Sequence, residues 1–219
     1  MGTGRLQAAM KLLLENWRKY LLTEAAMTAE DLMSYEDVEL YVIIQDDGED
    51  GIDIWLAGPN AIDGEILPRF DYLSDPPGGS VNIMPSEYGV SQGNGDCDGA
   101  WMVVGSAVSD GWGPLLYDIA IEYATERGGK GLIADRDMIS DDARAVWDYY
   151  HDSRGEVKGH QLDDLHNTLT PEEEDNCDQY VASVGGKYDW QENSLSKRYT
   201  KPPVTIDKLK ELGRLIDET

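Results

Sequence analysis

The feature that most constrains the fold is the uncharged run over residues 100–108, which leads through a glycine-rich turn into an amphipathic segment. The run is apolar almost throughout and rich in Val, which is typical of a β-strand buried on both faces. Gly111-Trp112-Gly113 predicts a turn, and Pro114 suits the first residue of a helix, because no N–H is needed there. Apolar residues at helical spacing follow, and Gly128-Gly129 predicts the helix end.

A second strand and helix are expected directly downstream. Residues 131–134 predict a short strand, and Ser140 is a suitable N-cap for a helix with Val146 and Trp147 on its apolar face. Strand, helix, strand and helix in this order form a βαβα unit, whose crossover is expected to be right-handed. The sequence therefore predicts an α/β fold with this unit at its centre.

Further strands are predicted in a hairpin, in a Gly- and Pro-rich region and near the C-terminus: residues 38–45, 52–57, 81–84, 180–184 and 195–200. Residues 151–176 predict an acidic loop or short helices. Thr205 is the expected cap of a last helix, whose apolar face includes Leu212 and Ile216.

The length of 219 residues favours one well-formed core. Residues 1–23 predict an amphipathic leader helix, and within residues 1–20 four basic residues against Glu15 alone give a charge of +3. This helix is expected either to pack on the core or to dock onto a partner protein. Residues 24–200 are predicted to form the folded domain, and residues 201–219 to add a C-terminal helix that packs on it.

The net charge of −25 argues against binding to DNA or RNA, whose phosphates would be repelled. It fits a solvated acidic surface or a basic partner. No apolar run is long enough to span a membrane, and no secretory signal is recognised, so a cytoplasmic location is expected. Cys97 and Cys177 are predicted to be free thiols in a reducing compartment, with a single bridge left open.

The glycine-rich turn is the best candidate for a binding site. Backbone N–H groups at the start of a helix, together with the helix dipole, suit a pyrophosphate. Residues 108–113, Val-Ser-Asp-Gly-Trp-Gly, resemble the acetyl-CoA signature of GNAT-type N-acetyltransferases, Gln/Arg-x-x-Gly-x-Gly/Ala. Residues 131–135 are similar to that family's next strand, and residues 140–147 resemble its Asn-x-x-Ala-x-x-Leu-Tyr helix. The resemblance covers residues 100–152 and is greatest to bacteriophage-encoded members.

The resemblance implies a mixed, mostly antiparallel sheet with helices on both faces, and acetyl-CoA as the cofactor. The cofactor-binding residues that it implies are Ser106, Ala107, Val108, Gly111, Trp112 and Gly113. The acceptor would be a primary amine on a small molecule or a protein, and an acidic site favours a cationic one. Tyr150 is the candidate acid, one helical turn beyond Trp147. The candidate base is Glu122, with Glu87, Asp96 and Asp98 as alternatives.

An alternative is a GNAT-like phage protein without catalysis, serving as a virion-associated or host-interaction module. Val108 stands where the family usually has Gln or Arg, and Trp147 stands where many members have a tyrosine acid. Asp110 also puts a negative charge beside the expected pyrophosphate. A counter-defence protein that binds a basic host factor is a third alternative. The histidines His151, His160 and His166 match no metal-ligand spacing, so no metal is predicted.

Overall fold

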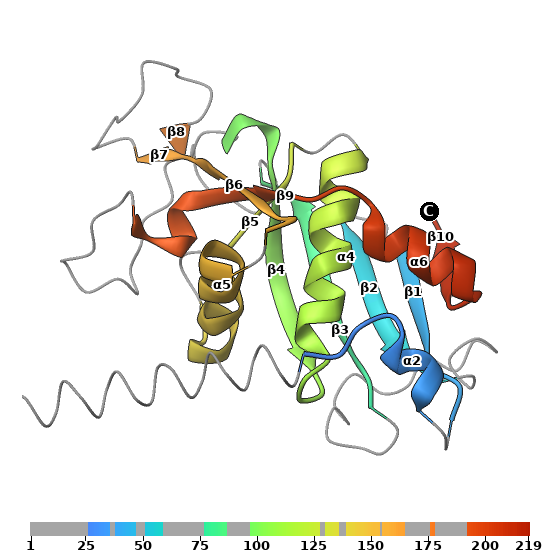
Figure 1. Cartoon of the computed structure of the whole chain (residues 1–219). Helices are drawn as coiled ribbons and strands as arrows, with labels where there is room; N and C mark the ends of the chain where they lie inside the picture. The colour runs from blue at the N-terminus through green and yellow to red at the C-terminus, as the bar shows by residue number, and fades with distance from the viewer. Residues whose placement is uncertain are drawn as a thin grey trace, which may run out of the picture.

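The computed structural model describes residues 26–35, 38–46, 51–58, 77–86, 97–127, 130–135, 139–153, 155–164, 176–177 and 192–219. Its centre is an eight-stranded sheet with the strand order β10-β1-β2-β3-β4-β5-β9-β6 (Figure 1). The strands are β1 (Tyr41–Asp46), β2 (Ile52–Ala57), β3 (Gly79–Pro85), β4 (Trp101–Val108), β5 (Leu132–Ile133), β6 (Lys158–Gln161), β9 (Lys197–Thr200) and β10 (Leu215–Glu218). A separate parallel pair is formed by β7 (Asp163–Asp164) and β8 (Asn176–Cys177).

The described helices are α2 (Asp31–Ser34), α4 (Gly113–Glu126), α5 (Asp141–Ser153) and α6 (Val204–Leu212), with the 3-10 turns η2 (Cys97–Gly99) and η4 (Ser194–Ser196). The order β4, α4, β5, α5 is the predicted βαβα unit, and β4 and β5 pair in parallel. β1 and β10 are also parallel, whereas the other neighbours in the sheet are antiparallel. The fold is therefore mixed α and β with a mostly antiparallel sheet, as predicted, and the hairpin of β1 and β2 is confirmed.

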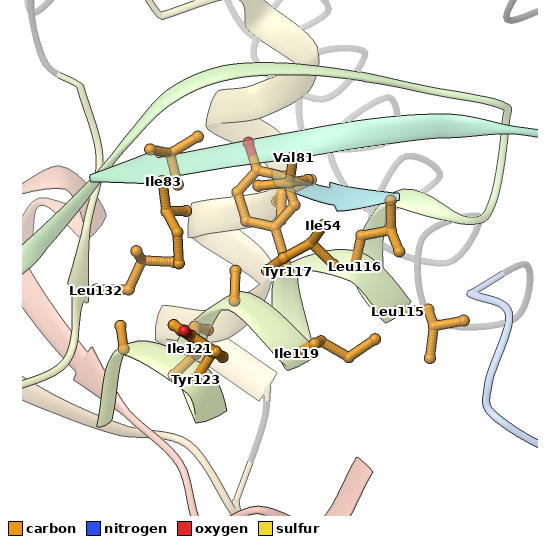
Figure 2. Packing of buried hydrophobic residues seen from close by; sticks show 14 of the residues in the cluster. Ile54, Val81, Ile83, Leu115, Leu116, Tyr117, Ile119, Ile121, Tyr123 and Leu132 are labelled. Carbon is orange, nitrogen blue, oxygen red and sulfur yellow. The ribbon is translucent and has the colours of Figure 1, made fainter. Parts of the chain in front are cut away.

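The core lies between α4 and the sheet (Figure 1). Figure 2 shows Leu116 of α4 beside Ile54 of β2, and Val81 of β3 and Ile119 of α4 belong to the same cluster. All four side chains are fully enclosed. Each aliphatic side chain of this size stabilises the fold by about 1.5–3 kcal/mol when it is withdrawn from water. Burial of one whole helix face against the sheet therefore holds the start of α4 at a defined place beside β4.

Helices α5 and α6 lie on the same side of the sheet as α4. Tyr150 of α5 donates a hydrogen bond to Asp118 of α4, and Glu122 of α4 accepts backbone hydrogen bonds from the first turn of α6. On the other face, the buried cluster in the described residues comes from Cys97, Ala100, Met102, Ile133 and Leu162. Within the described ranges the helices thus cover one face, whereas helices were expected on both.

Several local predictions are wrong. After α5, residues 158–161 form β6, an edge strand beside β9, where a loop or short helices were predicted. Its sequence, Lys-Gly-His-Gln, has no apolar residue to indicate a strand. At the C-terminus, Gly213 has φ +65° and ends α6, so Ile216 lies in β10 beside β1 rather than on the helix. Pro203 holds the N-cap position of α6, and Thr205 makes no cap hydrogen bond.

Cys97 is disulfide-bonded, so the prediction of free thiols is wrong. The one other cysteine in the sequence is Cys177, which lies in β8, and β8 contacts η2. This proximity arises from the fold and has no signal in the sequence spacing. The predicted leader helix over residues 1–23 and the strand over 180–184 lie outside the described residues. Within the described ranges, no helix is both long and apolar enough to cross a membrane.

Candidate functional site

Strand β4 is paired along its whole length on one edge, whereas on its other edge a described strand pairs with its first two residues only. β3 pairs with it from Gly79 opposite Val108 to Pro85 opposite Trp101. The register shifts between Asn82 and Ile83, which face Gly105 and Val103, so Val104 is the extra residue of a β-bulge. On the other side, β5 pairs only with Trp101 and Met102. Beyond the bulge, therefore, no described strand pairs with this second edge of β4.

The side chains of β4 change character at the same point. Met102 and Val103 are buried, whereas Gly105 and Ser106 are exposed. The prediction of a strand buried on both faces thus holds for its first half only. The reason is that β5 ends at Ile133, and that the bulge at Val104 bends β4 itself. The second half of β4, residues 104–108, is exposed at Gly105 and Ser106 and half-buried elsewhere, and this exposed half is the first part of the candidate site.

The turn into α4 is the second part. Gly111 has φ +84°, a left-handed conformation that favours glycine. The turn is held by backbone hydrogen bonds from Trp112 N to Ser109 O (3.1 Å) and from Met27 N to Gly111 O (2.9 Å). Gly113 then begins α4, so Pro114 is its second residue, one position later than predicted and still within the first turn. Pro114 has no N–H, and Leu116 N donates to Trp112 O (3.4 Å), so the first-turn N–H groups that can donate to an anion are those of Gly113 and Leu115.

Space is open at two glycines of this site. A Cβ atom added to Gly105 or to Gly113 would meet no other atom within 4 Å. Of the predicted cofactor residues, Ser106, Ala107 and Val108 lie on the exposed half of β4, and Gly111 and Gly113 lie in the turn. The indole of Trp112 is different, since it is 3% exposed and belongs to the core.

Glu122, the predicted base, lies inside the helix layer and is fully buried. Its carboxylate accepts backbone hydrogen bonds from Thr205 (2.8 Å) and Ile206 (2.7 Å) and forms an ion pair with buried Lys201. It therefore caps the N-terminus of α6, which lacks a side-chain cap of its own. Glu87 and Asp96 lie outside the described residues, as does the side chain of Asp98.

Tyr150, the predicted acid, is also buried, with 2% exposure. Its hydroxyl lies 2.9 Å from the carbonyl oxygen of Pro114 and 2.8 Å from Oδ1 of Asp118. The other carboxylate oxygen of Asp118 lies 3.3 Å from Nζ of Lys201. Tyr150, Asp118, Lys201 and Glu122 thus form one polar network that joins α4, α5 and the start of α6.

One contact in the site was not expected from the sequence. The hydroxyl of Tyr117 donates a hydrogen bond to Oγ of Ser106 over 3.1 Å, which joins α4 to the exposed half of β4. Burial raises the pKa of Tyr117, and the hydrogen bond to Ser106 opposes that rise in pKa. Trp147 lies edge-on to the Tyr117 ring, with centroids 5.5 Å apart, and stacks on Tyr199 at 5.3 Å. The periodicity of α4 indicates only that Tyr117 is helical, since its partner lies on another element.

The two histidines in the described part of the chain lie on different elements, α5 and β6. His151 contacts Asp152 over 3.0 Å on α5, and His160 contacts Thr200 over 2.9 Å between β6 and β9. His166 lies outside the described residues. No group of three potential metal ligands occurs among the residues that the structure describes.

Comparison with known proteins gives no relative. No protein-family model, curated protein or solved structure matches this chain.

A cavity of about 620 Å³ lies beside the first turn of α4. It is bounded by residues 26–30, by Pro114 and Leu115 of α4, and by α6. Its charged lining consists of Glu30, Asp118, Glu156, Asp207 and Glu211 against Lys201 and Lys208. Acidic groups outnumber basic ones in this lining, so the cavity favours a cationic ligand over an anionic one.

Proposed function

We propose that this protein binds acetyl-CoA and transfers the acetyl group to a primary amine. The observation that carries the proposal is the second edge of β4, which no described strand pairs beyond the bulge and which leads straight into a glycine-rich helix start. A strand edge can pair with an extended ligand that carries amide groups, such as the pantetheine arm. A helix start can receive the pyrophosphate. The proposal thus includes a GNAT-like arrangement of the sheet around this edge.

The chemistry requires four changes. The amine nitrogen attacks the carbonyl carbon of the thioester, a C–N bond forms, and the C–S bond breaks. The departing thiolate takes up a proton, and the amine, which attacks in its neutral form after its ammonium has released a proton to solvent, loses one. Because the chain is acidic and a neighbouring cavity has an acidic lining, the acceptor we propose is a cationic amine.

Within this proposal, Ser106, Ala107 and Val108 pair with the pantetheine arm, and Gly111 and Gly113 give the pyrophosphate close access to the backbone. The hydroxyl of Tyr150 contacts the carbonyl oxygen of Pro114 and thereby supports the first turn of α4. Glu122 supports the start of α6. Both predicted proton-transfer groups, Tyr150 and Glu122, are enclosed in this network, so their role within the proposal is structural.

The second candidate is a GNAT-like module without catalysis, associated with a virion or with a host protein. One observation favours it: the side chain at the position of the family's tyrosine acid is Trp147, which packs between Tyr117 and Tyr199 and carries no acidic hydroxyl. Both candidates place the protein in the host cytoplasm or on the virion. They differ in whether acetyl-CoA binds and turns over.

Isothermal titration with acetyl-CoA and CoA tests the proposal. Gly105→Val is the informative variant, because its side chain enters open space in the free protein and stands in the way of a ligand on β4. Gly155→Val is the matched control, since an added Cβ there also meets no atom within 4 Å, and Gly155 belongs neither to β4 nor to the turn into α4. We expect the wild type and Gly155→Val to bind CoA alike and Gly105→Val to lose binding. Absence of binding to the wild type at millimolar CoA, or equal binding by Gly105→Val, would contradict the proposal.

Turnover is tested separately. Release of free CoA thiol from acetyl-CoA is followed with spermidine and with Nα-acetyl-lysine amide as acceptors. Amine-dependent release supports acetyl transfer. Binding without release for either amine favours the non-catalytic module.

A further inference from the structure

We propose that Tyr117 is a positioning residue that orients the Ser106 hydroxyl as a hydrogen-bond donor to the pantetheine arm of CoA. The inference rests on the proposed function. It adds one residue, from the interior of α4, that neither the signature nor the helical periodicity indicates.

The contact joins the core to the site. Ser106 lies opposite Val81 in the register of β3 and β4, and Val81 packs in the core beneath α4. The Ser106 side chain therefore points to the α4 side of the sheet, where the Tyr117 hydroxyl reaches its Oγ over 3.1 Å. Figure 2 shows the Tyr117 ring beside Val81, with the hydroxyl directed toward the sheet. Tyr117 thus approaches Ser106 from the α4 side of the sheet, and Ser106 itself is exposed.

The Tyr117 hydroxyl is held in one place. The residue is 3% exposed, and the Trp147 ring meets it at an interplanar angle of 85°. A ring packed on its flank in this way cannot swing without disturbing its neighbours. Burial also raises the pKa of Tyr117, so the hydroxyl keeps its proton in neutral solution and remains a donor.

The fixed Tyr117 hydroxyl determines the direction in which the Ser106 hydroxyl can donate its hydrogen. A serine hydroxyl on an exposed strand rotates among its rotamers and has one hydrogen to donate. When Oγ accepts the hydrogen of Tyr117, its own hydrogen must point to another acceptor. The two amide carbonyls of the pantetheine arm are acceptors of the required kind. Orientation of the hydroxyl before binding reduces the entropy lost when the arm is bound.

The experiment measures the dissociation constant of CoA by isothermal titration for Tyr117→Phe, Ser106→Ala and the double variant. Loss of one neutral hydrogen bond is expected to weaken CoA binding about 3- to 10-fold in each single variant. The double variant is expected to bind no more weakly than Ser106→Ala, because Tyr117 acts through Ser106. Ser106→Thr keeps a hydroxyl and is expected to weaken CoA binding less than Ser106→Ala does.

Tyr123→Phe is the matched control, because Tyr123 is a second buried tyrosine of α4 that packs on Trp101. We expect it to leave CoA binding unchanged. The inference is overturned if Tyr117→Phe binds CoA like the wild type, or if it weakens binding further in the Ser106→Ala background. If the wild type does not bind CoA, the proposed function fails as well. If the wild type binds and only these variants show no effect, this inference fails alone.

Discussion

Replacement of Lys201 by methionine tests whether the buried network holds α6 on α4. The Lys201 side chain is 1% exposed and its ammonium contacts Glu122, Asp118 and the hydroxyl of Thr205 (2.6 Å). Methionine fills a similar volume but leaves two carboxylates in the interior without their cation. Removal of one partner of a buried ion pair costs about 3–5 kcal/mol, because the remaining charge cannot be hydrated.

One feature of the structure favours a cost near the upper end of this range, and another favours a cost near the lower end. Both carboxylates share one cation, so its loss affects two buried groups at once. Against this, Glu122 keeps its two backbone N–H donors from Thr205 and Ile206. For a chain of about this length, 1 kcal/mol shifts the melting temperature by about 2–4 °C, so a decrease of about 6–20 °C is expected.

Urea unfolding followed by tryptophan fluorescence and by circular dichroism measures the effect. Lys208→Met is the matched control, because that side chain is 38% exposed and lies 3.7 Å from Glu30 and 3.8 Å from Glu211. Exposed pairs contribute at most about 1 kcal/mol. In Lys201→Met with Asp118→Asn, part of the loss should return, since the asparagine oxygen can still accept the hydrogen bond of Tyr150 without a buried charge. Equal stabilities of Lys201→Met and Lys208→Met would refute the reasoning.

Three further predictions concern two glycines and one buried tyrosine. Gly79→Ala should lower the free energy of unfolding by about 1–3 kcal/mol, because φ is +136° and the new Cβ would lie 2.3 Å from the Ala107 carbonyl oxygen; a chemical melt with unchanged stability would contradict this. Gly213→Ala should cost about 1–2 kcal/mol, from the left-handed φ of +65° alone, and Gly213→Asn less, as thermal melts would show. Tyr199 has a pKa raised by burial and by Asp148 and Asp152. The unfolded chain therefore releases this proton first, and stability should fall as pH rises above about 10. Tyr199→Phe should flatten the decline in urea melts between pH 9 and 11.5, and an unchanged slope would count against it.

Much of the central unit follows from the sequence. The apolar residues of β4 and the turn at Gly111 lie where the pattern predicts them, and α4 begins within one residue of its predicted start. Ser140 caps α5 through a hydrogen bond from Ala143 N to its Oγ (3.1 Å). These signals are local, since each depends on residues within one turn or one strand. β6 and β10 lack such a signal, because they form by pairing with strands elsewhere in the sheet.

The candidate site was predictable only in part. Its position at the end of β4 and the start of α4 follows from the glycines and Pro114. The roles of Tyr150 and Glu122 do not, since both were expected at the site and both are buried in the helix layer. Their polarity is visible in the sequence, whereas their partners are not.

The sequence by itself determined the order of the central elements and the acidic character of the protein, because propensity, periodicity and charge belong to the residues themselves. The tertiary structure alone decided which half of β4 is exposed, and that Tyr117 reaches Ser106. It also paired Lys201 with Glu122, which lies 79 positions away in the chain. The physical reason is that exposure and hydrogen bonding depend on which groups meet in space, and a strand pattern or a helix face does not specify its partner.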